Sequence, residues 1–176
     1  MSTKASPPLP PVTSQPVSER QMRDALGQFA TGVTVVTTLD QEGSPVGLTV
    51  SSFNSVSLSP PLVLWSLDCQ SRAQAAFRQC THYAVNILST DQLRWALQFA
   101  ARDIDRFAGV KVQTGLHGIP VLEGTLATFV CANRSQYPEG DHTIFVGEVL
   151  ACQVHPEGAP LLYHRGKLLD QIQLGT

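Results

Sequence analysis

The sequence has few charged residues, few cysteines and no long hydrophobic segment. Only 15% of its 176 residues are Asp, Glu, Lys or Arg, against roughly 25% in an average globular protein. The net charge of −2 lacks the basic excess that nucleic-acid binding requires, so no nucleic-acid partner is expected. No apolar run reaches about 18 residues, which excludes a transmembrane helix and a membrane partner. Four cysteines are too few for a disulfide scaffold.

Motifs of several common enzyme classes are also missing. Gly27 and Gly32 have the glycine spacing of a phosphate-binding loop, but Val33 stands where that motif needs lysine. The sequence contains neither the Gly-x-Gly-x-x-Gly dinucleotide fingerprint nor the Gly-x-Ser-x-Gly nucleophile elbow. The four cysteines and five histidines lack the spacing of zinc ligands, so we expect no metal site.

The first 17 residues differ in composition from the rest. Residues 1–17 contain five prolines between serines and threonines, which predicts a disordered Pro-rich tail followed by one domain over 18–176. This segment lacks the hydrophobic core of a signal peptide, so we expect a cytoplasmic protein with free thiols. The domain combines low charge with 43% apolar residues, which hints at surface hidden by oligomerisation.

Strands dominate the predicted domain, and most of them follow one another directly. Ser18 and Gln21 have capping-box spacing before a first helix, whose apolar face holds Met22, Ala25, Leu26 and Phe29. Ser71 with Gln74 and Ser89 with Gln92 repeat that spacing before helices that end near Gln79 and Ala100; Leu93, Ala96, Leu97 and Ala100 form the apolar face of the later one. The predicted strands are 33–38, 46–58, 62–67, 83–88, 125–134, 142–154, 161–163 and 167–169. Residues 62–67 are apolar on both faces, and 103–120 is expected to be a long loop. This order favours a mainly β, antiparallel barrel with a few flanking helices over a parallel sheet.

The segment 46–58 changes phase in its middle. Leu48 and Val50 point to one side, Phe53 breaks the alternation, and Val56 resumes it. A bend or bulge is therefore expected between Ser51 and Asn54. Backbone donors freed at such a bend can serve a ligand, whereas the alternative, which the pattern alone favours, is a solvent-facing kink.

Three short motifs are candidates for a binding site. Cys69-Gln70-Ser71-Arg72 comes between a strand and a helix, which suits an anion, although Ser71 could simply cap its helix. Gly140-Asp141-His142 places a histidine in a turn, where it is either functional or merely solvated. Asp105-Arg106-Phe107 is either a loop anchor or a pair reaching over a site. Together they indicate a β-rich domain that binds a phosphorylated ligand.

Residues 21–170 resemble the short-chain flavin reductase family, the reductase components of two-component flavin monooxygenases. The matching segments are FATGVTVVT (29–37), GLTVSSFNSVSLSPP (47–61), YAVNIL (83–88), FAGV (107–110) and GDHTIFVGEV (140–149). The resemblance implies an antiparallel Greek-key split β-barrel of the FMN-binding type and a homodimer. It implies that NADH or NADPH reduces FMN or FAD, and that reduced flavin passes to a partner monooxygenase. The alternatives are a reductase of another acceptor, such as cobalamin or a ferric complex, and a non-enzymatic flavin-binding protein.

The resemblance also implies roles for particular residues. His142 matches the histidine near the nicotinamide and is the predicted catalytic residue. The backbone around Ser51 and Ser52 is implied to face the flavin ring. The predicted cofactor-binding residues are Thr34, Val35, Thr49, Val50, Ser51, Ser52, Phe53, Cys69, Gln70, Ser71, Arg106 and Phe107.

Overall fold

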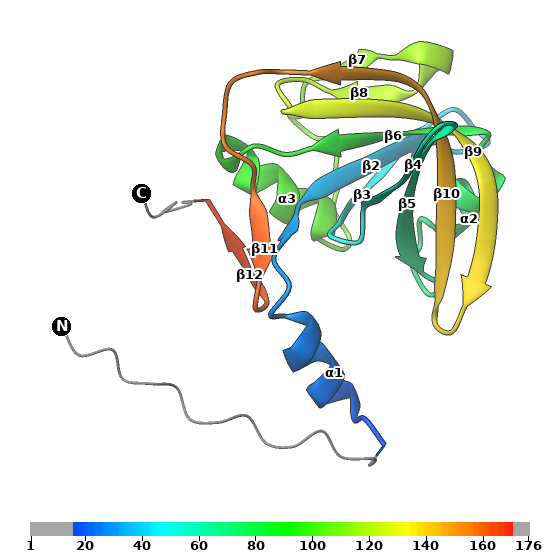
Figure 1. Ribbon diagram of the computed structural model, residues 1–176. Coiled ribbons are helices and arrows are strands. Elements are labelled where there is room, and N and C mark those ends of the chain that lie inside the picture. The colour runs from blue at the N-terminus through cyan, green and yellow to red at the C-terminus, as the bar shows by residue number, and fades with distance from the viewer. Residues whose placement is uncertain (1–15, 171–176) are drawn as a thin grey trace.

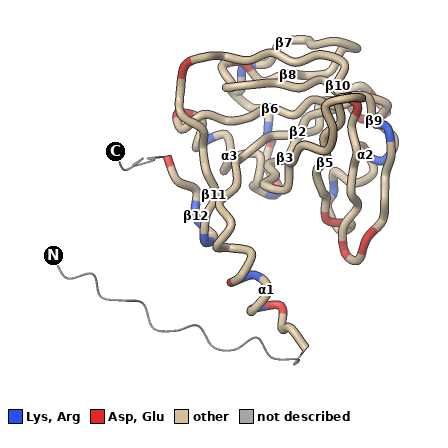
Figure 2. The backbone as a smooth tube through the Cα atoms, viewed as in Figure 1, with Lys and Arg blue, Asp and Glu red and all other residues tan. Residues whose placement is uncertain are grey.

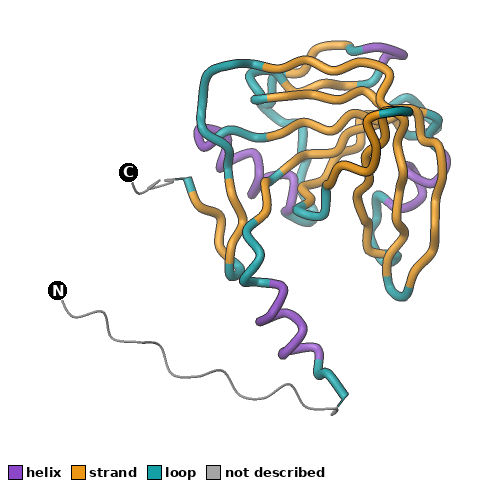
Figure 3. The backbone as a smooth tube through the Cα atoms, viewed as in Figure 1, coloured by secondary structure: helices purple, strands orange, loops and turns teal. Residues whose placement is uncertain are grey.

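A computed structural model describes residues 16–170, and strands make up almost half of them (Figures 1 and 3). Residues 1–15 of the predicted Pro-rich tail lie outside the described residues. The strands are β1 (Thr31–Gly32), β2 (Thr34–Leu39), β3 (Pro45–Val50), β4 (Asn54–Leu58), β5 (Pro61–Asp68), β6 (His82–Ile87), β7 (Val112–Thr114), β8 (Pro120–Leu122), β9 (Ala127–Glu139), β10 (His142–Val154), β11 (Leu162–His164) and β12 (Lys167–Leu169). The helices are α1 (Glu19–Leu26), α2 (Gln74–Gln79), α3 (Leu93–Ala100) and the 3-10 turns η1 (Thr90–Gln92) and η2 (Leu116–Gly118).

A seven-stranded antiparallel sheet in the order β3-β2-β6-β9-β10-β5-β4 forms the body of the protein. Its two edge strands, β3 and β4, follow each other in the chain. Only residues 51–53 link them, and a link of that length spans at most about 14 Å. The sheet therefore curls until its edges approach each other, and within residues 16–170 no β-ladder bridges this seam. The predicted mainly β, antiparallel barrel is confirmed.

The predicted bend in segment 46–58 is confirmed as well. β3 ends at Val50, β4 begins at Asn54, and the two strands pair with opposite ends of the sheet. The phase change in the sequence thus marks the point where the chain leaves one edge of the barrel for the other.

Aromatic side chains fill the barrel interior. The ring of Trp65 stacks on Phe145 with centroids 4.7 Å apart and meets the edge of Phe77 at 4.9 Å. All three side chains are fully buried. A second apolar cluster, which includes Val35 and Phe99, lies between the barrel and α3. The aromatic cluster contains Val36 and the second cluster contains Val35, so β2 is packed on both of its faces.

The predicted apolar face of the α3 helix is correct only in part. Ala96 is buried and Leu93 packs against the core as predicted, but the structure buries Phe99, whereas Ala100 is exposed and Leu97 is 58% exposed. The capping box of Ser89 and Gln92 is present, but it opens a 3-10 turn before the α-helix begins at Leu93. A 3-10 turn advances each residue further round the axis than an α-helix does, so the residues facing the barrel shift.

The predicted capping box at Ser71 is also wrong. α2 begins at Gln74 with Ala73 as its N-cap and no side-chain capping bond. The side-chain amide of Gln74 instead donates to Thr143 Oγ1 at 2.7 Å. A tertiary contact to β10 has replaced the local bond, and Ser71 remains in the loop before the helix.

Several element boundaries also differ from prediction. β5 alternates between buried and half-exposed residues, because only Val63, Trp65 and Leu67 face the core. β9 continues to Glu139 instead of ending at residue 134 as predicted, so only Gly140 and Asp141 separate it from β10. The predicted loop 103–120 contains β7 and η2. β7 pairs with β8, and His117 in η2 stacks on His82 in β6 with ring centroids 3.9 Å apart.

The first helix has the predicted capping box but does not bury its predicted apolar face. Ser18 and Gln21 bond to each other as expected. α1 projects from the barrel (Figure 1), and no residue of it is buried. Met22, Leu26 and the following Phe29 are 51%, 59% and 71% exposed. No helix within residues 16–170 is long and apolar enough to cross a membrane.

Candidate active site

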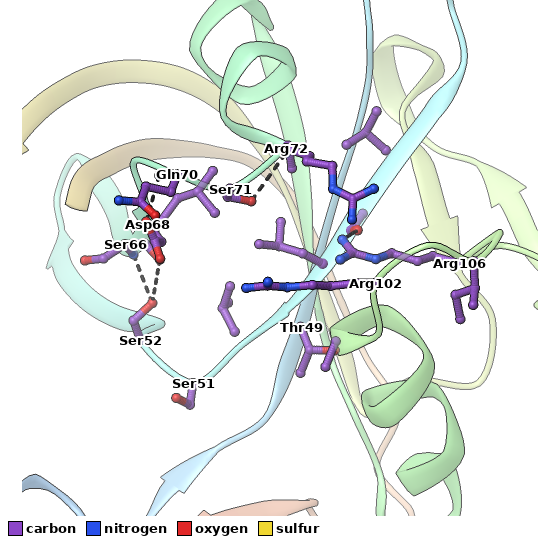
Figure 4. Close-up of a pocket in the computed structure, with 18 of the residues that line it drawn as sticks. Thr49, Ser51, Ser52, Ser66, Asp68, Gln70, Ser71, Arg72, Arg102 and Arg106 are labelled. Carbon is purple, nitrogen blue, oxygen red and sulfur yellow. Dashed lines mark hydrogen bonds between the residues drawn. The ribbon is translucent and has the colours of Figure 1, made fainter. Parts of the chain in front are cut away.

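A cavity of about 960 Å³ opens along the seam of the barrel (Figure 4). Three segments surround it: β3 with the start of its link to β4, the end of β5 with the following loop (66–73), and the loop after α3 (100–107). His142 at the start of β10 completes the lining. The sequence brings these segments together because β5 pairs with β10, and because α3 packs on β3.

The link between β3 and β4 is held to β5 by a serine. Ser52 Oγ accepts a hydrogen bond from Ser66 N at 2.9 Å and donates to Ser66 O at 3.1 Å. Thr49 Oγ1 donates to Ala96 O at 2.7 Å and ties β3 to α3. β3 is an edge strand, so alternate backbone groups along it have no partner in the sheet. The cavity therefore has a fixed wall with backbone donors and acceptors.

Arg106 holds the opposite wall in place. Its Nε and Nη2 donate to Ala101 O at 2.9 and 2.8 Å, and its Nη1 donates to Gly47 O at 2.8 Å. Burial, with a smaller contribution from the positive charge of Arg72, lowers the pKa of Arg106. The donors of Arg106 thus connect the loop after α3 to β3, while its charge faces the cavity.

The ring of Phe107 covers β3 beside Arg106. It meets the ring of Phe99 edge-on, with centroids 5.0 Å apart. A Cβ atom on Gly47 would lie 2.7 Å from Phe99 Cε1 and 3.1 Å from Phe107 Cζ. Glycine at this position allows both rings to pack directly against the strand backbone.

The loop between β5 and α2 brings polar groups to the cavity. Gln70 N donates to Asp68 Oδ1 at 2.7 Å, and Ser71 N donates to Asp68 O at 2.9 Å. Gln70 and Ser71 line the cavity, whereas Cys69 lies beside it with its Sγ 3.8 Å from Thr143 Oγ1. The predicted anion-binding loop therefore contributes two of its three predicted residues to the cavity.

His142 lies at the rim, where the register of β10 sets it opposite Asp68. Its Nδ1 is 2.6 Å from Asp141 Oδ1, and this hydrogen bond lowers the pKa of Asp141. Asp141 is therefore ionised at neutral pH, so Nδ1 donates and Nε2 is left for other partners.

Besides Cys69, three of the predicted cofactor-binding residues do not line the cavity. Thr34 and Val35 are buried in β2, and Thr34 Oγ1 donates to Val50 O at 3.2 Å. Phe53 packs against Phe129 with centroids 5.7 Å apart. The other predicted residues that line the cavity are Thr49, Val50, Ser51, Ser52, Gln70, Ser71, Arg106, Phe107 and His142.

Sequence reasoning missed three charged residues of the cavity. They are Asp68 at the end of β5, and Arg102 and Asp103 in the loop after α3. Figure 4 shows the side chains of Arg72, Arg102 and Arg106 in the same part of the cavity. Charged residues also occur outside the cavity, for example on α1 (Figure 2). The charged run Arg102-Asp103-Ile104-Asp105-Arg106 was the only indication of Arg102 and Asp103 in the sequence. It does not predict a site, because the side chains of a loop can point in any direction.

The open seam makes this fold a split β-barrel. The cavity at the seam has an exposed strand edge and several guanidinium groups, which suit a flat ligand with anionic groups. Residues 26–170 match the family described as "Flavin reductase like domain", and the chain belongs to this family. The predicted resemblance and the split-barrel fold type are therefore confirmed. Within residues 16–170, no three His, Cys, Asp or Glu side chains form a group that could hold a metal ion.

Relatives with assigned names agree with this family. The chain is 46% identical over 149 residues to an FMN reductase (NADH) of Agrobacterium fabrum, covering 85% of this chain and 84% of the relative. It is 39% identical over 156 residues to the reductase subunit of a flavin-dependent monooxygenase of Rhodococcus jostii, covering 89% and 80%. Its structure is similar to the NADH:FAD oxidoreductase of Streptomyces globisporus, with a TM-score of 0.86, 35% identity, and coverage of 95% and 100%.

Proposed function

We propose that this chain is a flavin reductase that uses NADH to reduce FMN or FAD. The observation that carries the proposal is the cavity at the barrel seam, which has both an edge strand for a flat ring and guanidinium groups for phosphate. At about 960 Å³ it is at the upper end of ordinary ligand pockets. The residues present thus fit a flavin. Relatives named as an FMN reductase (NADH) and an NADH-dependent flavin reductase support the reaction.

Different residues of the cavity would bind different parts of the flavin. The backbone at Ser51 and Ser52 would bond to the polar edge of the ring, and Phe107 would contact its apolar part. Ser71 and Arg102 would hold the phosphate, since guanidinium and hydroxyl groups are good phosphate donors. When bound, the flavin supplies the ring system that accepts a hydride from the nicotinamide. The protein contributes mainly by holding the two rings together in a fixed orientation.

His142 is proposed to orient the nicotinamide. Asp141 fixes its tautomer, so its Nε2 can accept a hydrogen bond at the cavity rim. His142→Ala should raise the KM for NADH or slow flavin reduction and leave the Kd for FMN nearly unchanged. His155→Ala, an exposed histidine outside the cavity, is the matched control. Unchanged kinetics in the His142 variant would remove this role.

The reaction can be tested with purified protein. NADH oxidation is followed by absorbance with FMN, with FAD and without flavin, and each assay is repeated with NADPH. Flavin-dependent oxidation of NADH is the expected result. Flavin binding without NADH oxidation would instead identify a binding protein, and oxidation that requires a ferric complex or a corrinoid would identify another acceptor.

A separate monooxygenase is proposed to receive the reduced flavin. The support is the name of the Rhodococcus jostii relative, a reductase subunit of a flavin-dependent monooxygenase, and of a Rhodococcus opacus relative, a monooxygenase reductase component. Addition of such an oxygenase together with its substrate should give product only when NADH, flavin and this protein are all present.

The protein is proposed to act as a homodimer. The exposed apolar side chains of Met22, Leu26 and Phe29 gather at the projecting α1 helix. The four charged side chains of α1 pair within the helix, Arg20 with Asp24 and Arg23 with Glu19, so the helix has no net charge that would oppose burial of its apolar side chains. Light scattering should give twice the chain mass, and Leu26→Lys combined with Phe29→Lys should give the monomer. A wild-type monomer at micromolar concentration would refute the dimer.

A further inference from the structure

An ion pair joins two loops that line the cavity. Arg72 Nη2, between β5 and α2, lies 2.7 Å from Asp103 Oδ1, which follows α3. Both residues line the cavity, and their side chains are 70% and 78% exposed. An ion pair exposed to this extent contributes only about 0–1 kcal/mol. Either partner can therefore be exchanged for another charged group at little cost.

The three arginines of the cavity differ in what they already bind. Arg106 donates three hydrogen bonds to two backbone carbonyl oxygens, Ala101 O in its own loop and Gly47 O on β3. Arg72 is paired with Asp103. Among the described residues, Arg102 has neither an ion pair nor a hydrogen-bond partner. An entering phosphate therefore finds Arg102 unpaired, whereas at Arg72 it meets a guanidinium group that already has one nitrogen, Nη2, on a carboxylate.

Asp103 has a backbone conformation that a non-glycine residue rarely adopts. Its φ of 60° lies in the left-handed region, which costs most residues roughly 1–2 kcal/mol. Asp and Asn tolerate this region better than other side chains. The chain thus turns sharply at the point where the carboxylate meets Arg72.

We propose that Asp103 is a specificity-determining residue, because its carboxylate competes with ligand phosphate for Arg72 and so weakens the hold of the cavity on phosphorylated ligands. The proposal rests on the proposed function, since a reductase that supplies a separate enzyme must release its flavin. The phosphate can belong to the flavin or to the dinucleotide. The two sources are distinguished by comparing FMN with riboflavin, and NAD⁺ with nicotinamide riboside.

The test measures Kd by calorimetry for wild type, Asp103→Asn, Arg72→Gln and the double variant. Asparagine keeps the left-handed backbone and removes only the charge. Asp103→Asn should lower the Kd for FMN about two- to fivefold, the range of an exposed ion pair, and leave riboflavin unchanged. Arg72→Gln should raise the Kd for FMN, and in that background Asp103→Asn should give a smaller gain. A shift seen for NAD⁺ but not for FMN supports the same competition and assigns the phosphate to the dinucleotide.

Glu157→Gln is the control for net charge, because it removes one carboxylate from an exposed loop outside the cavity. Equal changes for FMN and riboflavin, an equal effect of Glu157→Gln, or strict additivity of the two cavity variants would overturn the proposal. A wild type that binds and reduces FMN while Asp103→Asn changes no Kd would overturn this inference alone. A wild type that neither binds flavin nor oxidises NADH would overturn the proposed function with it.

Discussion

Replacement of Gly47 by alanine should destabilise the protein and weaken flavin binding together. The added Cβ would lie 2.7 and 3.0 Å from Phe99 Cε1 and Cδ1 and 3.1 Å from Phe107 Cζ. Phe99 is fully buried, so its ring cannot move away freely. Overpacking of this kind costs about 1–3 kcal/mol. The lower entropy of the unfolded chain offsets about 0.4–1 kcal/mol of that cost. The middle of each range leaves a net loss of about 1.3 kcal/mol, which lowers Tm by about 3–5 °C in a chain of this size.

The same clash should reach the cavity. Gly47 O accepts the hydrogen bond from Arg106 Nη1, and Phe107 lines the cavity beside it. Displacement of either ring therefore moves the wall that contacts the ligand, and the Kd for FMN should rise. Thermal unfolding by circular dichroism and calorimetric titration with FMN measure the two effects.

Gly32→Ala is the matched control. No atom lies within 4 Å of a Cβ at Gly32, and its backbone is not left-handed, so Tm should stay constant or rise slightly. Phe99→Leu combined with Gly47→Ala should be less destabilised than the sum of the two single changes. If Gly47→Ala matched Gly32→Ala in both Tm and FMN affinity, the close packing of the rings on β3 would be refuted.

Three other predictions follow from buried groups and from the loop anchor. Burial raises the pKa of Cys80, Tyr83 and Cys131, that of Cys131 to about 12. Their contribution to stability is complete below the unfolded pKa values and is lost as pH rises toward the folded ones. The free energy of unfolding measured in urea should therefore be constant near pH 7–8. Above about pH 9 it should fall by up to ~1.4 kcal/mol per pH unit for each group. A constant free energy of unfolding up to pH 11 would contradict this. Asn86→Ala should cost about 2–4 kcal/mol in urea unfolding, because the buried amide donates to Val35 O and accepts from Leu122 N at 3.0 and 3.1 Å, whereas the exposed Asn54→Ala should cost little. Arg106→Lys keeps the charge but cannot make three directed bonds, so the Kd for FMN should rise several-fold with little change in kcat at saturation; an unchanged Kd would contradict the anchor.

Local pattern was enough to predict most of the strands. β10 covers the residues expected of it, and the break between Val50 and Asn54 was visible as a change of phase. These features depend on side-chain alternation along one strand, which the sequence states directly. The capping boxes at Ser18 and Ser89 were also predicted correctly, because their bonds connect residues three apart.

Predictions failed where a long-range contact replaced a local one. Gln74 bonds to Thr143 on β10 and leaves Ser71 without its capping role. The 3-10 turn before α3 brings Phe99 onto the barrel in place of Leu97. Neither contact has a signal within a window of a few residues, since the partners are brought together only by the closed sheet.

The sequence by itself determined the strand content, the bend at the seam and, through its similarity to a known family, the class of reaction. Tertiary structure alone decided which residues share the cavity. The order of strands places Gly47, Ser71 and His142 around one space although they are far apart in the chain. It also buries Val35, which resemblance had assigned to the ligand, and it sets Arg102 and Asp103 on the cavity wall. Strand pairing depends on residues far apart in the chain. Closure of the barrel therefore decides which charged side chains face a ligand, and the pattern along the sequence does not contain this information.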